Sequence, residues 1–147
     1  MITEQKPLPD CTIFLLAKAY QRAHGMFKNQ LSPYGLTNLQ HLVLEGLWHQ
    51  EGQTAAELGK MLVLDKATLS GVIDRLVDGR WIEKRRDPSD GRVQRLFTAK
   101  KAAGLKDELI ALRRRANTDL LAVLPAGEQA LLKRMLRDLM QEGPHAE

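Results

Sequence analysis

The chain has 147 residues, ordinary hydrophobic content, few aromatic residues, a single cysteine and a formal net charge of +4. These values predict one helix-rich, soluble domain, although an obligate oligomer could share its core between chains. The sequence has no membrane-length apolar run, no apolar signal core at its N-terminus and no second cysteine to pair with Cys11, so it excludes a membrane span and predicts a cytoplasmic location.

Two amphipathic helices are predicted in the first third of the chain. The first spans about residues 10–30, with Tyr20 and Phe27 on its apolar side. Thr37 is expected to cap the second, over about residues 38–50. Because apolar residues cover most of the circumference of this second helix, we expect it to lie centrally in the fold.

Residues 54–77 have the pattern of a helix-turn-helix. Thr54 and Glu57 have the spacing of a capping box, and Asp65 is expected to cap the second helix, over residues 66–77. The inward face of that helix is aliphatic: Leu69, Val72, Ile73 and Leu76. Its outward face has small or polar side chains: Lys66, Ala67, Thr68, Ser70, Gly71, Asp74 and Arg75. Such a slim face, able to form hydrogen bonds, is what a DNA major groove admits.

The hydrophobic pattern then changes to that of a hairpin. Residues 81–85 and 93–97 are predicted strands, and residues 86–92 between them contain Pro, Ser, Asp and Gly, which are typical of turns. The tip of this hairpin carries arginines. A helix-turn-helix followed by a basic hairpin is the plan of a winged helix.

Two further helices complete the chain. Thr98 is expected to cap a long helix that ends near Leu124 and has a regular apolar seam: Ala102, Leu105, Leu109, Leu112, Ala116 and Leu120. The last helix, over residues 128–140, is expected to bury an aliphatic face: Leu131, Leu132, Met135, Leu136 and Leu139. The terminal helices have more apolar surface than one small winged domain covers, so they form either an intramolecular bundle or an interface with a second chain.

The charge is concentrated on the winged segment. Residues 54–101 hold eleven basic and seven acidic side chains, whereas basic and acidic residues are equal in number on either side of that segment. A randomly charged solvated face could produce a modest excess. Its coincidence with a helix-turn-helix favours nucleic acid as the partner.

The chain resembles the MarR (multiple antibiotic resistance regulator) family of transcription factors. The residues that carry the resemblance are 64–70 (LDKATLS), 82–85 (IEKR) and the wing signature Asp90-Gly91-Arg92, and the similarity extends over about residues 12–140. It implies a mainly α fold with a small β wing: a winged helix-turn-helix over 36–98 and a helical dimerisation region from 1–35 and 99–147, in one intertwined domain. It also implies a homodimer that binds a pseudo-palindromic double-stranded DNA operator, as a repressor that a small effector releases.

Two departures from the family pattern affect the wing. Gly79 and Arg80 are transposed, so we expect either a positive φ at Arg80 or a helix that ends one residue early. The second strand is one residue short before Thr98, and Lys101 replaces the family's usual glycine. These changes concern the register and tilt of the wing.

Three groups of DNA-contacting residues are expected. Base edges should be contacted by Lys66, Ala67, Thr68, Ser70 and Gly71. Phosphates should be contacted by Thr54, Arg75, Lys84, Arg85, Arg86 and Arg95. Across the turn, the Asp90 carboxylate should orient the Arg92 guanidinium toward a narrow minor groove.

The family resemblance also implies a cleft between the winged region and the dimerisation helices that often takes aromatic acids. Candidate effector contacts from this chain are Tyr20, His24, Phe27, His41 and Trp48. We expect no cofactor and no metal, because His41 and His49 lie about 12 Å apart along one helix, too far to share an ion.

Other functions have less support in the sequence. No phosphate loop, nucleophile elbow or Cys-x-x-Cys motif predicts an enzyme. Two alternatives stay open: redox regulation through Cys11, and a winged-helix interaction module that binds no DNA. A cationic hairpin tip argues against the interaction module.

Overall fold

The computed structural model describes residues 9–141; the first and last few residues of the predicted dimerisation region lie outside that range. The chain is mainly helical with one two-stranded sheet, which confirms the predicted fold class. The elements are α1 (Thr12–Leu31), the 3-10 turn η1 (Ser32–Tyr34), α2 (Asn38–His49), α3 (Ala55–Leu62), α4 (Lys66–Asp78), β1 (Ile82–Arg86), β2 (Gln94–Thr98), α5 (Lys100–Leu121) and α6 (Ala126–Met140). None of the helices in residues 9–141 has the length and apolar character needed to cross a bilayer.

Side-chain caps define the starts of α2, α3 and α4. Thr37 and Thr54 each accept a hydrogen bond from the backbone amide three residues later, and Gln40 and Glu57 accept one in return, so both helices begin with a capping box. Asp65 accepts from the Thr68 amide at 2.8 Å and caps α4. All three predicted caps are confirmed.

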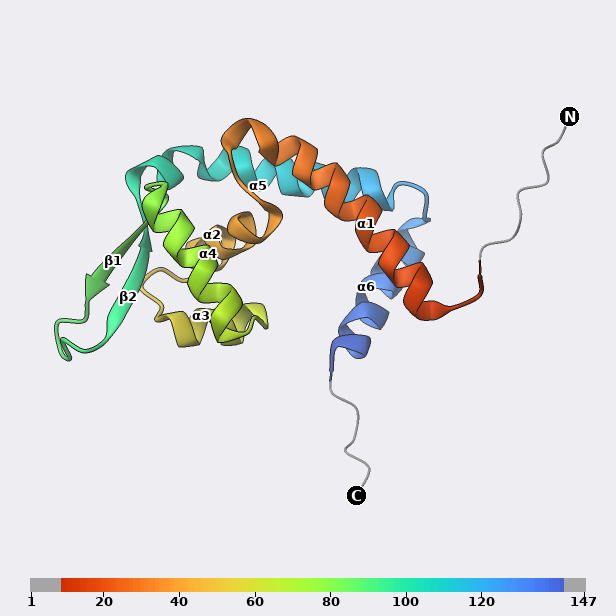
Figure 1. Ribbon diagram of the computed structural model, residues 1–147. Coiled ribbons are helices and arrows are strands. Elements are labelled where there is room, and N and C mark those ends of the chain that lie inside the picture. The colour runs from red at the N-terminus through yellow and green to blue at the C-terminus, as the bar shows by residue number, and fades with distance from the viewer. Residues whose placement is uncertain (1–8, 142–147) are drawn as a thin grey trace, which may run out of the picture.

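The buried core is centred on the winged half, and α1 and α5 contribute Leu31, Ala102 and Leu109 to it. α2 lies at the centre, with α3, α4 and the sheet packed around it (Figure 1). The fully buried side chains are almost all aliphatic: Leu31, Val43, Leu44, Leu47, Leu58, Leu76 and Ile82. The predicted inward face of α4 is confirmed at Leu69, Ile73 and Leu76, each at most 3% exposed.

The connection from α4 to β1 confirms one of the two expected outcomes of the transposition. Arg80 has φ 60°, and α4 continues to Asp78 instead of ending early. The Trp81 amide donates to the Leu76 carbonyl at 2.8 Å and the Arg80 amide to the Val77 carbonyl at 3.0 Å, the hydrogen-bond pattern of a Schellman cap. Arginine thus occupies the left-handed position that normally favours glycine.

Glycine at position 79 has a separate packing reason. A Cβ there would lie 3.0 Å from a carbon of the Trp81 ring and 3.3 Å from the Arg75 carbonyl oxygen. Lys101 also packs on this ring, its Nζ 4.3 Å from the ring centroid and 3.3 Å from the Gly79 carbonyl oxygen. The close approach of Trp81 therefore accounts for the glycine, and Lys101 covers the outer face of the same ring.

Both strands lie one residue later in the chain than the sequence predicted, and the predicted cap at Thr98 is wrong. Thr98 is the last residue of β2 and pairs with Ile82, and the next amide, of Ala99, donates to the Trp81 carbonyl at 2.8 Å. Both the amide and the hydroxyl of Thr98 donate to the Glu51 carboxylate. Since Glu51 occupies this hydroxyl, α5 begins at Lys100 with no side-chain cap.

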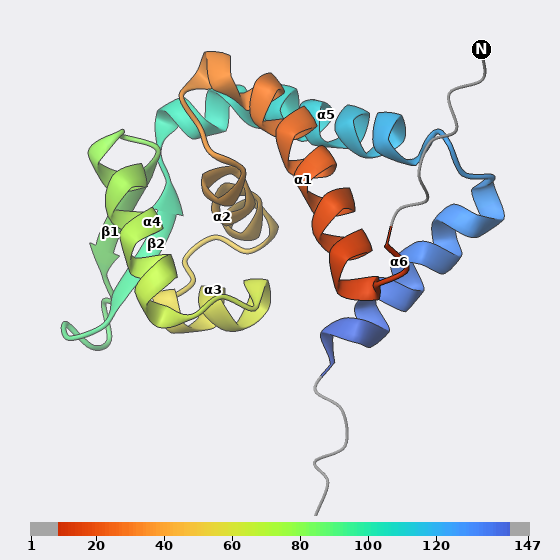
Figure 2. The ribbon, with the colours of Figure 1, turned by 45° about the vertical axis from the view of Figure 1, so that its right-hand side comes forward.

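The terminal helices form a second, open half. α5 extends away from the sheet, α1 packs against α5, and α6 follows the far end of α5 (Figures 1 and 2). The α6 face that we expected to be buried is not buried within one chain: Leu131 and Met135 are each 43% exposed and Leu139 is 64% exposed. On α1, Ile13 is 79% exposed. The single chain therefore leaves an apolar surface without an intramolecular partner.

Candidate nucleic-acid interface and adjoining cavity

The first two turns of the outward face of α4 are exposed, and Asp74, further along that face, contacts Lys84 of the wing. The predicted base-contacting residues are all exposed on it: Lys66, Ala67, Thr68, Ser70 and Gly71. Added bulk at Gly71 would meet no atom within 4 Å. Arg75, one turn further, is also exposed. Helix α4 therefore presents a slim polar surface along its first two turns.

The Thr68 hydroxyl is already engaged as a donor. Its Oγ1 donates to Asp65 Oδ2 at 2.7 Å, while the Thr68 amide donates to the other oxygen of the same carboxylate. Both hydrogen bonds lower the pKa of Asp65 below its ordinary value, and the one from the Thr68 backbone amide has the larger effect. In this arrangement the hydroxyl offers an external partner only its lone pairs, so it would act as an acceptor toward a base.

The wing tip shows the predicted pairing of Asp90 with Arg92. Asp90 Oδ1 accepts from the Arg92 amide at 3.1 Å and from its Nε at 3.3 Å. The Arg92 side chain is nevertheless 93% exposed. The pair directs the guanidinium without covering it.

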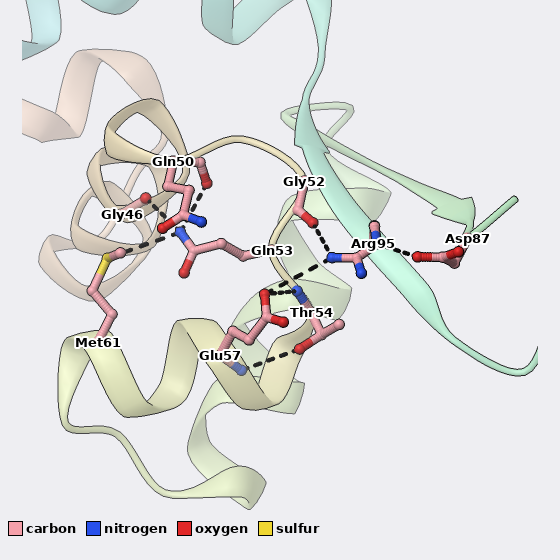
Figure 3. A network of polar contacts seen from close by, with 9 residues as sticks. All are labelled: Gly46, Gln50, Gly52, Gln53, Thr54, Glu57, Met61, Asp87 and Arg95. Atoms are coloured by element: carbon pink, nitrogen blue, oxygen red, sulfur yellow. Dashed lines mark hydrogen bonds and ion pairs between the residues drawn. The ribbon is translucent and has the colours of Figure 1, made fainter. Parts of the chain in front are cut away.

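Arg95, near the hairpin-loop end of β2, has an inward environment. Its Nε donates to Asp87 Oδ2 at 2.5 Å, its Nη1 donates to the Gly52 carbonyl at 2.9 Å, and the same Nη1 lies 3.9 Å from a Glu57 carboxylate oxygen (Figure 3). The Asp87 carboxylate is only 13% exposed, and the hydrogen bond from Arg95 lowers its pKa. Arg95 thus connects the wing to the start of α3.

Gln53 lies beside the Arg95 network and bonds to the C-terminal end of α2 (Figure 3). Its buried side-chain amide donates to the carbonyls of Gly46 and Gln50 at 2.9 and 2.8 Å, which satisfies the end of α2 (Figure 3). The sequence analysis did not single out Gln53 or Asp87. The Gly46 partner of Gln53 lies in α2 and the Arg95 partner of Asp87 lies in β2, so local spacing did not identify these contacts.

The remaining wing cations are less constrained. Lys84 lies 3.3 Å from Asp74 of α4, and Arg85 pairs with Glu83 while its guanidinium lies 4.4 Å from the centroid of the Phe97 ring. Arg86 is exposed at the end of β1. A hollow of about 360 Å³ separates α3 and α4 from the wing, with Lys66, Ser70 and Lys84 on its wall. The structure therefore brings cations of α4 and of the wing to one concave surface.

A larger cavity, of about 550 Å³, lies between α1, α2 and α5. Four of the five candidate effector contacts line it: Tyr20, His24, Phe27 and His41. Trp48 does not line the cavity; its ring packs behind His41, with the two ring centroids 6.3 Å apart. The sequence analysis missed four polar residues of the lining: Asn38, Glu45, Arg113 and Asn117.

His41 is the most buried polar residue of this cavity wall. It is 1% exposed, its Nε2 lies 3.0 Å from the Leu109 carbonyl oxygen, and the Phe27 ring meets it edge-on at 4.9 Å. Burial lowers the pKa of His41 from 6.5, against the opposing effect of its hydrogen bond to Leu109. A neutral ring that donates from Nε2 satisfies this geometry.

Across residues 9–141, no three His, Cys, Asp or Glu side chains gather closely enough to hold a metal ion. Cys11 is exposed at the start of α1 and makes no capping hydrogen bond with its side chain.

The MarR family model matches residues 36–93. The HTH-type transcriptional repressor NicR of Pseudomonas putida is 30% identical over 132 residues, which cover 90% of this chain and 84% of NicR. A MarR mutant from Escherichia coli, solved in complex with operator DNA, is 26% identical with a TM-score of 0.79, covering 86% of this chain and 91% of that one. The PcaV regulator of Streptomyces coelicolor, solved with its natural ligand, is 28% identical with a TM-score of 0.80, covering 92% and 96%.

Proposed function

This chain belongs to the MarR family, and from that premise we propose that it is a homodimeric transcriptional repressor that binds a specific double-stranded DNA operator and is released by a small effector. The exposed polar face of α4 carries the proposal. That face and the cationic wing border one concave surface, which suits a recognition helix in a major groove with a wing beside it.

The proposed contacts divide according to how each side chain is held. Lys66, Ala67, Thr68, Ser70 and Gly71 contact base edges, with the Thr68 oxygen as an acceptor. Phosphates are contacted by Thr54, Arg75, Lys84, Arg85 and Arg86. Arg92, oriented by Asp90, enters the minor groove. The charge of Arg95 would suit a phosphate contact as well. Its three inward partners instead favour an indirect contribution to DNA binding, in which Arg95 holds the wing in position.

The dimer is supported by the apolar surfaces of α1 and α6, which the single chain leaves exposed. A second copy that covers these surfaces would divide each chain as the sequence suggested, into a dimerisation region (1–35 and 99–147) and a winged region (36–98). Two α4 helices related by a two-fold axis would then match a pseudo-palindromic operator.

The effector site that we propose is the cavity between α1, α2 and α5. It lies where the winged half meets the terminal helices, so a ligand there touches both regions. Tyr20, His24, Phe27 and His41 supply aromatic and titratable groups to its wall. Trp48 would act only by supporting the His41 ring.

The function is tested by selecting bound duplexes from random DNA and measuring affinity for the selected site and for a scrambled duplex over a range of salt concentrations. We expect a two-fold-related consensus and a specific affinity at least about a thousandfold above that for scrambled DNA. Binding should weaken steeply as salt rises, because several phosphate contacts release counterions. A selection that yields no consensus, with equal affinity for both duplexes, would contradict the proposal and favour an interaction module.

A further inference from the structure

The loop that joins α2 to α3, residues 50–54, forms a short third strand beside β2. The Gly52 amide donates to the Leu96 carbonyl at 2.9 Å, and the Leu96 amide donates to the Gln53 carbonyl at 2.8 Å. Gly52 has φ 78°, and a Cβ there would lie 3.2 Å from two carbons of the Phe97 ring. Glycine permits both this backbone conformation and this close approach. The loop therefore lies directly against the middle of β2.

Side chains extend this contact toward both ends of β2. Toward α5, the Glu51 carboxylate accepts from both the amide and the hydroxyl of Thr98. Toward the hairpin loop, Arg95 Nη1 donates to the Gly52 carbonyl at 2.9 Å (Figure 3). Together with the backbone bridge at Leu96, these contacts hold β2 nearly from end to end. The strand cannot turn relative to the loop without losing hydrogen bonds.

Gln53 in turn fixes the loop to α2. Its side chain is buried, 2% exposed, and the amide nitrogen donates to the carbonyls of Gly46 and Gln50 at 2.9 and 2.8 Å (Figure 3). The side chain of this residue thus bonds to the C-terminal end of α2, while its backbone carbonyl bonds to β2. Because both contacts come from one buried residue, the end of α2 sets the direction of β2.

The other strand of the wing is held less firmly to the recognition helix. Lys84 of β1 pairs with Asp74 of α4 at 3.3 Å, but the two side chains are 36% and 63% exposed. An exposed ion pair contributes little to holding two elements together, and a two-stranded hairpin is at best marginally stable by itself. Beyond its base, the wing therefore depends on the loop for its direction.

A small rotation at the loop becomes a large displacement at the wing tip. Arg92 lies four residues before Leu96, at most about 13 Å of extended chain. A rotation of about 10° at Leu96 would move the Arg92 backbone by about 2 Å, against a minor groove about 6 Å wide. The bond from Asp90 fixes the guanidinium relative to the hairpin tip only, so it cannot correct such a displacement.

We propose that Glu51 and Gln53 are positioning residues for DNA recognition: without touching DNA, they fix the wing relative to α4 and so determine whether Arg92 reaches the minor groove. This inference rests on the proposed function and assigns operator specificity to two residues that the proposed DNA contacts do not include. It predicts a division of effects, because α4 has its own contacts with α2 and α3. Changes at Glu51 or Gln53 should weaken recognition by the wing and spare recognition by α4.

A double-mutant cycle with Arg92→Ala tests the role of Glu51. Glu51→Ala alters an exposed side chain, so the chain should stay folded, and affinity for the selected duplex should fall about tenfold. Loss of a negative charge would by itself strengthen DNA binding, so charge cannot explain this fall. Arg92→Ala should cost at least about tenfold in the wild type but at most about threefold in Glu51→Ala, where the guanidinium is already displaced. Asp107→Ala, which removes a carboxylate exposed on α5, is the matched control and should leave the cost of Arg92→Ala unchanged.

Gln53→Met tests the contact with α2. Methionine approximates the shape of the glutamine side chain but cannot donate, so two carbonyls lose their donor and the melting temperature should fall. A role in stability alone would leave the cost of Arg92→Ala unchanged in the folded protein, whereas a positioning role reduces it. Selection from random DNA gives an independent readout. Both Glu51→Ala and Gln53→Met should lose the preference for A·T base pairs beside each half-site and keep the preferences at the positions that α4 contacts.

Glu51→Ala decides the inference even if Gln53→Met does not fold. A full tenfold cost of Arg92→Ala in folded Glu51→Ala would overturn it, as would an equal loss of preference at the wing and α4 positions. No cost of Arg92→Ala in the wild type would also overturn it, because the wing would then read no DNA. Failure of the wild-type chain to select any operator would instead contradict the proposed function.

Discussion

The winged half and the terminal helices use similar aliphatic residues with opposite outcomes. In the winged half, Leu44, Leu47 and Leu58 are completely buried because α2 is surrounded by helices and the sheet. In α6, no residue is buried, although its leucines and methionines repeat at helical spacing just as regularly. Periodicity predicts which face of a helix is apolar. It does not predict whether that face is covered by the same chain or by another.

The two halves therefore have different requirements for stability. The core of the winged half is closed within one chain, with Leu31, Ala102 and Leu109 contributed by α1 and α5. The terminal helices need a second copy to remove their remaining apolar surface from water. Each of the following experiments perturbs one half, or the seam between the halves, where α2 packs against α5. If the comparison is correct, a change in one half should leave the other half unaffected.

Removal of residues 126–147 should have the largest effect. Without α6, the apolar surfaces that it covers across the proposed interface are exposed, so we expect a monomer or an aggregate with at least a hundredfold lower operator affinity. Sedimentation and DNA titration would measure both. A stable dimer with normal operator affinity after this deletion would place the interface elsewhere. It would also contradict the claim that the terminal helices need a second copy to cover their apolar surface.

Two arginines of the wing form a matched pair for mutation: Arg92 is exposed, whereas Arg95 is hydrogen-bonded within the chain. Arg92→Ala should cut operator affinity at least tenfold with almost no change in melting temperature, because an exposed pair contributes less than about 1 kcal/mol to stability. Arg95→Gln should lower both the affinity and the melting temperature, since it frees Asp87 and the Gly52 carbonyl from their partner. Asp90→Ala should cost less affinity than Arg92→Ala.

The salt dependence of operator affinity distinguishes a direct phosphate contact from a residue that positions the wing. Loss of a direct phosphate contact lowers the slope of log affinity against log salt by about one, whereas loss of a positioning residue does not. We expect an unchanged slope for Arg95→Gln. A slope reduced by about one would restore Arg95 to the phosphate contacts.

On the recognition helix, Thr68→Ala should weaken operator binding by about 1–3 kcal/mol and relax specificity at one base pair in each half-site. It also removes the hydroxyl bond to Asp65, so a small loss of stability should accompany it. Comparison of specific with random DNA is the measurement. An equal loss on both would mean that Thr68 contacts phosphate.

The seam between the halves should respond to pH through His41. Burial lowers its folded pKa below 6.5, so the unfolded chain takes up the proton first. Its contribution to stability is therefore fully present above about pH 6.5 and falls as the pH drops toward the folded pKa. Denaturant unfolding at several pH values should show this loss, and His41→Gln should reduce it. An unchanged profile in that variant would assign the loss to other groups.

Within the winged half, Arg80→Gly should give the smallest effect and a gain. The left-handed φ at residue 80 costs an L-residue about 1 kcal/mol, so glycine should stabilise the fold by roughly 0.5–1 kcal/mol. Gly79→Ala is the matched control and should destabilise, because a Cβ there meets the Trp81 ring. Chemical unfolding of both variants is the measurement.

Several features of this structure depend only on residues that are close in the sequence, so the sequence alone was enough to predict them. The caps at Thr37, Thr54 and Asp65 depend on residues within one helical turn, so their spacing was sufficient. The same is true of the Asp90–Arg92 pair, two residues apart across a turn. For Arg80 the sequence left two outcomes open, and the structure selected the positive φ. The family resemblance added the architecture and the class of partner.

Only the tertiary structure decided the roles of groups whose partners are distant in sequence. Glu51 occupies the Thr98 hydroxyl from 47 residues away, which is why the predicted cap failed. Arg95 bonds to Gly52 across 43 residues, and Arg113 to Glu45 across 68. A charged side chain has the same appearance in a sequence whether it is solvated, paired or poised over a cavity. The packing of α2 against α5 and the wing selects among these states, because it fixes which opposite charge and how much water each side chain meets.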